Sequence, residues 1–356
     1  MPHQGGKDFV SAQGKEGTVG DDQGVKMAYF LAGDLGGTKT LLALCETGPD
    51  GHLVLAEQRL QSHGYPDLGA MLEEFLASAP FIPEVAVFAV AGPVLGDQAR
   101  LTNLGWTIDR HLLKERFRFR AVALMNDLVA VAHAVPVLAA DRLFTINTGR
   151  SDPQGGIAVL APGTGLGEAF LCWDGSRYRP YPSEGGHVDF ASTSDEEDGL
   201  LHFLRARLAH VSYEQVCSGL GIANIFSYLA EGKGMAVAAD LAGAHAAADK
   251  TPLIVAHALA GDCPVCGRTM EIFLDVLAAE AGNLAVKFLA TGGVYLGGGI
   301  LPRILDAIDP VAFMEKFVGK GRMADLLADV PVHIIMNGDC ALLGAAGAGA
   351  RLARKG

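Results

Sequence analysis

The sequence contains one strand–glycine-turn–strand pattern twice, and this repetition constrains the fold more than any other feature. The first copy, FLAGDLGGTKTLLALC, spans residues 30–45, and the second, GGIAVLAPGTGLGEAFLC, spans residues 155–172. In each copy, apolar runs of strand length flank a glycine-rich turn, which is typical of a hairpin. Two copies of one such unit predict two related α/β lobes that face each other across a cleft.

Strand and helix patterns alternate around both copies, which favours an α/β fold. Helical spacing is found in residues 69–79, 111–117, 196–230 and 270–290, and buried strands are predicted for residues 84–94 and 121–125. Residues 292–305, GGVYLGGGILPRIL, predict a strand, a glycine triplet and the start of a helix. A strand in VPVHIIMN and a small-residue helix in ALLGAAGAGARLA complete the pattern.

Charge and hydropathy limit the function classes. The 356 residues, half of them hydrophobic, carry a formal net charge of -12, which argues against binding to nucleic acid or to anionic lipid. No apolar run approaches the ~20 residues of a membrane span, and the first residues lack the order of a secretory signal. We therefore expect a cytoplasmic protein with small-molecule ligands. Residues 1–26 are polar and without periodicity, and we expect them to form a disordered extension.

Six scattered cysteines fit buried or idle thiols in a reducing compartment better than a disulfide framework. Cys263 and Cys266, in GDCPVCGRT, resemble half of a zinc ribbon. Structural zinc normally takes four ligands, and the chain has no second pair of this kind. We therefore expect these two thiols to be structural.

Three glycine turns are candidate phosphate-binding sites. In GDLGGTKT, glycines 36 and 37 can adopt positive φ and let backbone N–H groups approach a phosphate, while Thr38 adds a hydroxyl group. APGTGLGEA repeats this arrangement, and LGGGILP supplies a third turn at a strand end, of the kind that accepts nucleotides. The chain has no Walker sequence, and GTGLG leads into a strand rather than a helix, so the dinucleotide interpretation is weak. Taken alone, a single Gly-Gly turn is more often just a hairpin.

Asn126 and Asp127 lie side by side where an apolar strand pattern ends and a helical pattern begins. A carboxylate at the end of a parallel strand points into the crevice of an α/β sheet and can accept a proton. The alternative is that Asp127 caps the helix, and the residues alone favour this alternative.

The string SEGGHVDF places Glu184 and His187 three residues apart around two glycines. This spacing can present a carboxylate and an imidazole to one ligand with vicinal hydroxyl groups. An ordinary polar loop is the alternative, and a metal site has no supporting second histidine motif. Asn103 and Trp106, in LTNLGW, could line the same ligand, although Trp106 could equally belong to the core. The acids at 195–198 predict a charged helix start.

Several motifs follow one another along the chain: AGDLGGTKTLLALC, AVAGPV, LTNLGW, MNDLVAVAHAVP, GTGLGEAFL, SEGGHVDFA, AHVSYEQVCSGLG, LGGGILPRIL and ALLGAAG. Together, and in this order, they resemble the bacterial glucokinases, a family of the actin-like sugar kinases. The similarity covers residues 28–348. SEGGHVDFA with GTGLG ahead of it is its specific part. Lys39 stands where many glucokinases of this subgroup carry Asn, and the related repressor–kinase group also favours GGTK.

The resemblance implies two actin-like (ribonuclease H-like) α/β domains with a cleft between them. The small domain would comprise residues 27–137 and 338–356, and the large domain residues 138–337. It also implies a homodimer that uses ATP and Mg2+ to convert glucose to glucose 6-phosphate for glycolysis.

The resemblance further implies a role for each matching residue. Asp127 would be the general base, and Asp34 would hold Mg2+ directly or through water. Glucose would be bound by Asn103, Asn126, Asp127, Glu184, His187 and Glu214. ATP would be bound by Gly33, Asp34, Leu35, Gly36, Gly37, Thr38, Gly163, Thr164, Gly165, Gly298 and Gly299.

Three alternatives stay open. The first is a kinase for another hexose, such as mannose, fructose or N-acetylmannosamine, because a fold does not fix the substrate. The second is a non-catalytic sugar sensor of the repressor–kinase group, which the net charge and the short polar N-terminal segment disfavour. The third is an ATPase that uses the same turns without a sugar.

Overall fold

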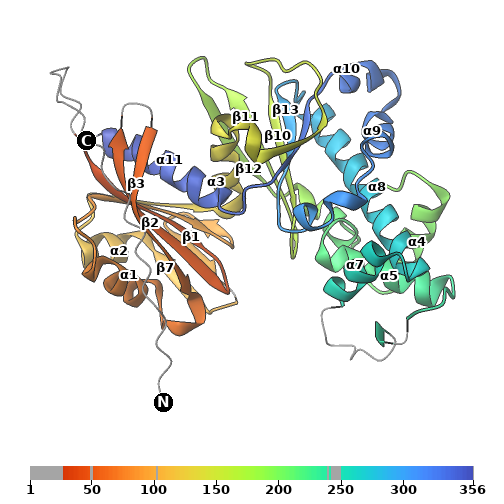
Figure 1. Cartoon of the computed structure of the whole chain (residues 1–356), viewed down its shortest axis with the longest axis horizontal. Helices are drawn as coiled ribbons and strands as arrows, with labels where there is room; N and C mark the ends of the chain where they lie inside the picture. The colour runs from red at the N-terminus through yellow and green to blue at the C-terminus, as the bar shows by residue number, and fades with distance from the viewer. Residues whose placement is uncertain (1–26, 49–50, 102, 239, 242–249, 356) are drawn as a thin grey trace. The chain divides into compact units, whose positions relative to one another are not determined.

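A computed structural model describes residues 27–48, 51–101, 103–238, 240–241 and 250–355. The chain divides into two compact units, the first ending at Pro136 and resuming at Asp339, and the second running from Val137 to Gly338 (Figure 1). The predicted N-terminal extension, residues 1–26, lies outside the described residues. Within those residues, no helix is long and apolar enough to cross a membrane.

The first unit is built on a five-stranded sheet in the order β3-β2-β1-β4-β8. The predicted first hairpin is confirmed, because β1 and β2 pair antiparallel, whereas β1, β4 and β8 run parallel. A small antiparallel sheet of β5, β6 and β7 belongs to the same unit. The strands are β1 (Tyr29–Leu35), β2 (Lys39–Gly48), β3 (Gly51–Gln61), β4 (Val85–Val90), β5 (Val94–Leu95), β6 (Gln98–Leu101), β7 (Trp106–Asp109) and β8 (Ala121–Asn126).

Side chains alternate between the two faces of this sheet and form two cores. Leu31 and Leu35 of β1 pack in one core with α1 (Leu68–Ala77) and with Leu113 of α2 (Arg110–Phe117). Phe30 and Ala32 face the opposite core, which α3 (Asp127–Ala134) and α11 (Cys340–Arg354) cover. The predicted small-residue helix is therefore α11, and in Figure 1 it lies beside α3.

The second unit contains a six-stranded sheet in the order β12-β11-β10-β13-β14-β9. The predicted second hairpin is confirmed by the antiparallel pairing of β10 with β11, while β13 pairs parallel to β10. The strands are β9 (Leu143–Asn147), β10 (Ile157–Pro162), β11 (Leu166–Trp173), β12 (Tyr178–Ser183), β13 (Gly293–Leu296) and β14 (Val332–Ile335).

Helices pack against this sheet around one large core. They are α4 (Asp195–Arg205), α5 (Gly219–Ser227), α7 (Thr251–Ala260), α8 (Pro264–Lys287), α9 (Pro310–Val318) and α10 (Ala324–Ala328). The prediction of a helix directly after the glycine triplet is wrong, because residues 301–303 and 305–307 form 3-10 turns. Asp309 caps a new helix that begins at Pro310, and the prolines at 302 and 310 confine any helix between them to a short segment.

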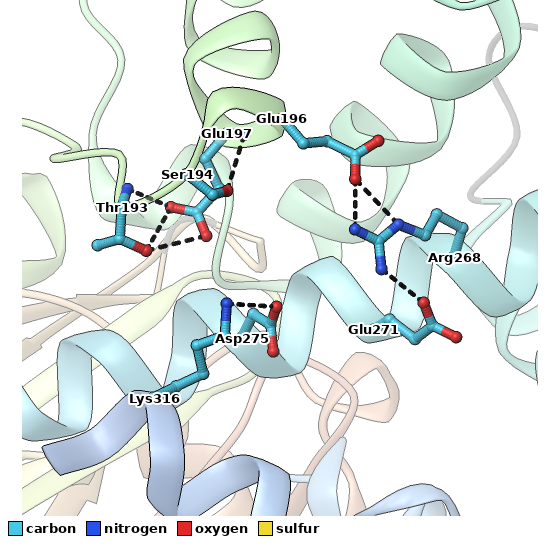
Figure 2. Close-up of polar contacts among 8 residues, drawn as sticks. All are labelled: Thr193, Ser194, Glu196, Glu197, Arg268, Glu271, Asp275 and Lys316. Carbon is cyan, nitrogen blue, oxygen red and sulfur yellow. Dashed lines mark hydrogen bonds and ion pairs between the residues drawn. The ribbon is translucent and has the colours of Figure 1, made fainter. Parts of the chain in front are cut away.

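The charged helix start predicted at 195–198 is confirmed and is shown in Figure 2. The Ser194 hydroxyl accepts from the Glu197 amide, and the Glu197 carboxylate accepts from the Thr193 amide at 2.6 Å. This is a variant of the capping box, and it fixes the chain that leaves the SEGGHVDFA segment. Glu196 is paired with Arg268, which ties α4 to α8.

Candidate active site

Strand register brings the polar residues of the first unit to one edge of its sheet. Leu35 at the end of β1 is paired with Val90, and Val90 is paired with Asn126 at the end of β8. Asp34 and Asp127 therefore lie at the carboxyl ends of parallel strands, where α/β sheets bind their ligands.

Asn126, and not Asp127, is the N-cap of α3. The Asn126 side chain accepts a hydrogen bond from the Leu128 amide at 2.9 Å, and its amide group donates to the Gly92 carbonyl at 3.4 Å. Asp127 is the first residue of the helix, and its carboxylate also accepts from the Leu128 amide at 2.9 Å. Burial raises the pKa of Asp127 above its ordinary value, against the lowering effect of that hydrogen bond.

The first glycine turn needs glycine for a reason other than the expected one. The expectation of positive φ is wrong for Gly36 and Gly37, since neither is among the positive-φ residues. Instead, a Cβ on Gly36 would lie 2.7 Å from the Lys39 carbonyl oxygen, so the turn is too tight for a side chain. A Cβ on Gly37 would lie 3.2 Å from the Asn103 side chain, which places Asn103 beside the turn. Thr38 is exposed at the turn's end.

Two of the residues predicted to bind ATP at the first glycine turn, Gly33 and Leu35, face the core. Gly33 is buried in β1, where a Cβ would press on the Phe88 ring, and the Leu35 side chain is fully buried. Only the backbone of these two residues can contribute to a phosphate site. Trp106 is also a core residue, at 6% exposure, so the core interpretation of this side chain is confirmed.

The Asp34 carboxyl group has surroundings that suit a cation. Burial and, to a smaller extent, the charges of Asp127 and Asp339 raise its pKa to about 6, against the lowering effect of Arg59. Arg59 and Asp339 form an ion pair at 3.0 Å. The sequence analysis missed both, because Asp339 comes from the distant C-terminal segment; its position directly before α11 was the available signal. Among the described residues no group of three or more ligands could hold a metal by itself. Mg2+ needs only one or two carboxylates when substrate phosphates complete its shell, so Asp34 fits such an ion.

The second and third glycine turns meet in the second unit. Gly163 closes the β10–β11 hairpin through a hydrogen bond from its amide to the Gly165 carbonyl at 2.8 Å. Gly298 has φ +84° and lies so close to Pro162 that a Cβ would collide with the Pro162 carbonyl. The parallel pairing of β10 with β13 brings these turns together.

A cavity of about 1090 Å³ opens beside these turns, within the second unit. Gly163, Thr164 and Gly299 form part of its wall. Its volume exceeds the range of about 300–1,000 Å³ that is typical of small-molecule sites. The sequence analysis missed its other lining residues, most of which come from helices with ordinary apolar patterns. They include Leu220, Ala223, Phe226, Thr251, Ile300 and Arg303.

Glu184, His187 and Glu214 converge in the same unit. The 3-10 turn η4 (Gly185–His187) follows Glu184, and His187 lies 3.9 Å from the carboxylates of both Glu184 and Glu214. The side chain of Glu184 is 89% exposed, whereas that of Glu214, in the 3-10 turn η5 (Tyr213–Gln215), is 24% exposed. Glu214 is held by the Leu166 amide at 3.0 Å.

These contacts give each unit its own set of predicted residues. The first unit groups Asp34, Asn103, Asn126 and Asp127 around the first glycine turn. The second unit links its glycine turns to the acidic and histidine residues, because Glu214 lies directly against Gly165. The predicted residues therefore form two chemically different groups, an acidic one in the first unit and one beside a large cavity in the second.

Cys263 and Cys266 are both buried, with their sulfur atoms 2.9 Å apart at the start of α8. No third and fourth zinc ligand joins them among the described residues.

Comparison with known proteins identifies the family of this chain. Residues 31–352 match the family model described as Glucokinase. A glucokinase of Nostoc sp. is 40% identical over 342 residues, which cover 92% of this chain and all of that protein. A glucokinase of Psychromonas ingrahamii is 37% identical over 319 residues, which cover 88% and 95% of the two chains.

Solved structures give the same result. The crystal structure of a glucokinase from an Antarctic psychrotroph is 34% identical, with a TM-score of 0.81 and coverage of 91% of this chain and 99% of that one. A ROK family glucokinase from Streptomyces griseus, in complex with glucose and AMPPNP, shares the fold at 21% identity, with a TM-score of 0.58 and coverage of 92% and 100%. The predicted class of two actin-like α/β domains is therefore confirmed. The chain belongs to the bacterial glucokinase family.

Proposed function

We propose that this chain transfers the γ-phosphoryl group of ATP to the 6-hydroxyl group of glucose, and that the glucose 6-phosphate feeds glycolysis. The observation that carries the proposal is the carboxyl pair of the first unit. Asp127 begins α3 at the end of β8, beside the Asp34 carboxyl group at the end of β1. Phosphoryl transfer to an alcohol is assisted by one carboxylate that accepts the proton of the hydroxyl group and by another that binds the metal cation.

Asp127 would accept the proton of the attacking hydroxyl group. Its raised pKa makes it a stronger base than a fully solvated aspartate, and the Leu128 amide keeps its carboxylate oriented. General-base assistance of this kind accelerates a reaction by about 10²–10⁴-fold.

The glycine turns would hold the phosphates through backbone amides. Thr38 and Thr164 are exposed, and each can add a hydroxyl donor to its turn. Asp34 would hold Mg2+ directly or through water. When it is bound, this ion neutralises negative charge on the phosphates. The cavity beside Gly299 would take the adenosine, since apolar residues such as Ala223 and Phe226 suit a purine ring.

Glu184, His187 and Glu214 would bind the sugar hydroxyl groups from the second unit, and Asn103 and Asn126 from the first. Carboxylates accept hydrogen bonds from hydroxyl groups, while amide and imidazole groups can also donate to them. At 3.9 Å, His187 is too far from either carboxylate for a direct hydrogen bond, so its ring nitrogens are available to the hydroxyl groups of a ligand.

Coupled-enzyme assays on purified protein test this proposal. Rates measured with glucose, mannose, fructose and N-acetylmannosamine should be highest for glucose, and ATP hydrolysis without sugar should be slow. Comparable turnover on mannose would favour the broader hexose kinase. Sugar-independent hydrolysis would favour the ATPase, and sugar binding without turnover would favour the sensor.

We also propose a cytoplasmic homodimer, as the resemblance implies. Sedimentation velocity over a range of concentrations checks the assembly: a single species of twice the 37.1 kDa chain mass is expected. A monomer at all concentrations would refute it.

A further inference from the structure

The first residues of β11 contact both proposed sugar-binding turns. The Leu166 amide donates to Glu214, and the Leu166 carbonyl lies directly against Gly186 of η4. Two residues later, the carboxylate of Glu168 lies so close to Gly185 that any Cβ there would collide with it. The Glu168 side chain therefore packs directly against the turn from Glu184 to His187.

Glu168 is an unusual residue for such a position. It is only 3% exposed, and its Oε1 atom has no hydrogen-bond partner within the part of the chain that the structure describes. An ionised carboxylate without a partner is costly in a buried site, whereas its protonated form is tolerated there. Burial, together with the charge of Glu280, raises the pKa of Glu168 to about 7.

Three sets of polar groups lie around Glu168. From α8, Glu280 is fully buried and accepts from Lys287 at 3.2 Å, and this lysine partly offsets the negative charge. Ser183 is opposite Glu168 in the β11–β12 pairing, and its hydroxyl group accepts from the Gly185 amide. The third group is the buried thiol of Cys217, whose pKa is raised by burial and by the charges of Glu280 and Glu168.

The same cluster reaches the second sugar-binding turn. The Asn283 amide group donates to Glu280 at 2.7 Å and to the Tyr213 hydroxyl at 2.9 Å, and Tyr213 precedes Glu214 in η5. Glu168 and Glu280 therefore lie behind both turns, and a change of charge at Glu168 acts on the backbone that carries the proposed sugar ligands.

We propose that Glu168 is a positioning residue for the turn from Glu184 to His187, and that its protonated form seats this turn for glucose binding. The proposal rests on the function proposed above. With a proton, Glu168 is neutral beside Glu280 and fits against Gly185. Without it, Glu168 and Glu280 repel each other, and the carboxylate must move or admit water, which displaces the turn.

Steady-state kinetics from pH 5.5 to pH 8.5 test the proposal with the variants E168Q and E168A. In the unmodified protein, KM for glucose should rise by about tenfold as the pH passes from 6 to 8, while kcat changes less. E168Q mimics the protonated form, so its KM should stay near the low-pH value throughout. E168A leaves a void beneath Gly185, and its KM should be raised at every pH.

E280Q provides a second readout that a purely structural role of Glu168 would not change. Removing the charge of Glu280 should lower the pKa of Glu168, so the rise in KM should begin at lower pH. Calorimetry in two buffers of different ionisation enthalpy should also show proton uptake on glucose binding near pH 7.5, and E168Q should lose it.

Two outcomes would overturn the inference. One is a KM profile of E168Q that follows that of the unmodified protein, and the other is an E280Q profile that does not shift. Either result, together with normal glucose phosphorylation, would leave the proposed function standing. Absence of glucose binding by the unmodified protein at every pH would instead reject the proposed function.

Discussion

Asp34 and Asp127 lie at the carboxyl ends of two parallel strands, where burial and the charge on Asp127 raise the pKa of Asp34 to about 6. Two carboxylates placed together without a bound cation disfavour each other's ionisation. Binding of a cation or of a proton at this pair therefore relieves the repulsion between the two carboxylates and stabilises the first unit.

This relationship predicts loss of activity in mild acid. Asp34 must be ionised to hold a cation and Asp127 must be ionised to accept a proton, so kcat/KM for ATP should fall as the pH decreases through about 6. Bound Mg2+ should favour the ionised form of Asp34, so higher Mg2+ concentrations should move the acid limb to lower pH. Initial rates from pH 5 to pH 8 at two Mg2+ concentrations measure both effects. An acid limb that does not respond to Mg2+ would argue against Asp34 as the cation ligand.

Gly165→Ala should weaken glucose binding. The added Cβ would collide with the Glu214 carboxylate, which must then leave the Leu166 amide and move relative to His187. We expect KM for glucose to rise at least tenfold, the effect of losing roughly one charge-assisted hydrogen bond. Gly267→Ala is the control, because a Cβ at this position meets no atom of the described residues within 4 Å. Equal KM values for the two variants would speak against Glu214 as a sugar ligand.

Ala223→Phe should act on ATP and not on glucose. Ala223 lines the cavity beside Gly163 and Gly299, and a phenyl ring there would occupy space proposed for adenosine. KM for ATP should rise by about tenfold or more, with a smaller change in KM for glucose. Leu259→Phe, at an exposed position of α7, is the matched control. If Ala223→Phe leaves KM for ATP unchanged, the nucleotide lies elsewhere.

Glu168→Gln should stabilise the protein at high pH. The folded-state pKa of Glu168, about 7, is above its ordinary value of 4.5, so the stability that the protonated carboxyl group contributes is complete below pH 4.5 and is lost as the pH rises through 7. Glutamine does not titrate, so the stability difference in favour of E168Q should grow by about 2 kcal/mol between pH 5 and pH 8. Urea unfolding at both pH values measures it. A pH-independent difference would place the folded-state pKa near its ordinary value.

The local patterns of the sequence were sufficient for the strands, hairpins and most helices. Alternating apolar residues around Gly36 and around Gly163 predicted both hairpins, since each hairpin is formed by neighbouring residues. The helix expected after Gly299 failed because prolines at 302 and 310 limit the segment more than its apolar residues favour a helix.

The candidate site was only partly predictable. Adjacent residues such as Asn126 and Asp127 mark their own strand end, but the roles of cap and base cannot be assigned before the backbone is known. The electrostatic interactions of Asp34 with Asp339 and of Glu168 with Glu280, and the contact of Glu168 with Gly185, join separate segments of the chain. No periodicity in the sequence encodes such pairs, because they arise only when strands and helices pack.

The role of Asp127 as the general base is tested by the glucose-dependent formation of ADP by the unmodified protein and by Asp127→Asn, with glucose binding measured in parallel by calorimetry. Asparagine keeps the shape of the side chain and removes its basicity. We expect kcat to fall by about 10²–10⁴-fold in the variant while glucose still binds, and we expect Asp141→Asn, at an exposed position, to retain full activity. Turnover of Asp127→Asn close to that of the unmodified protein would contradict the account.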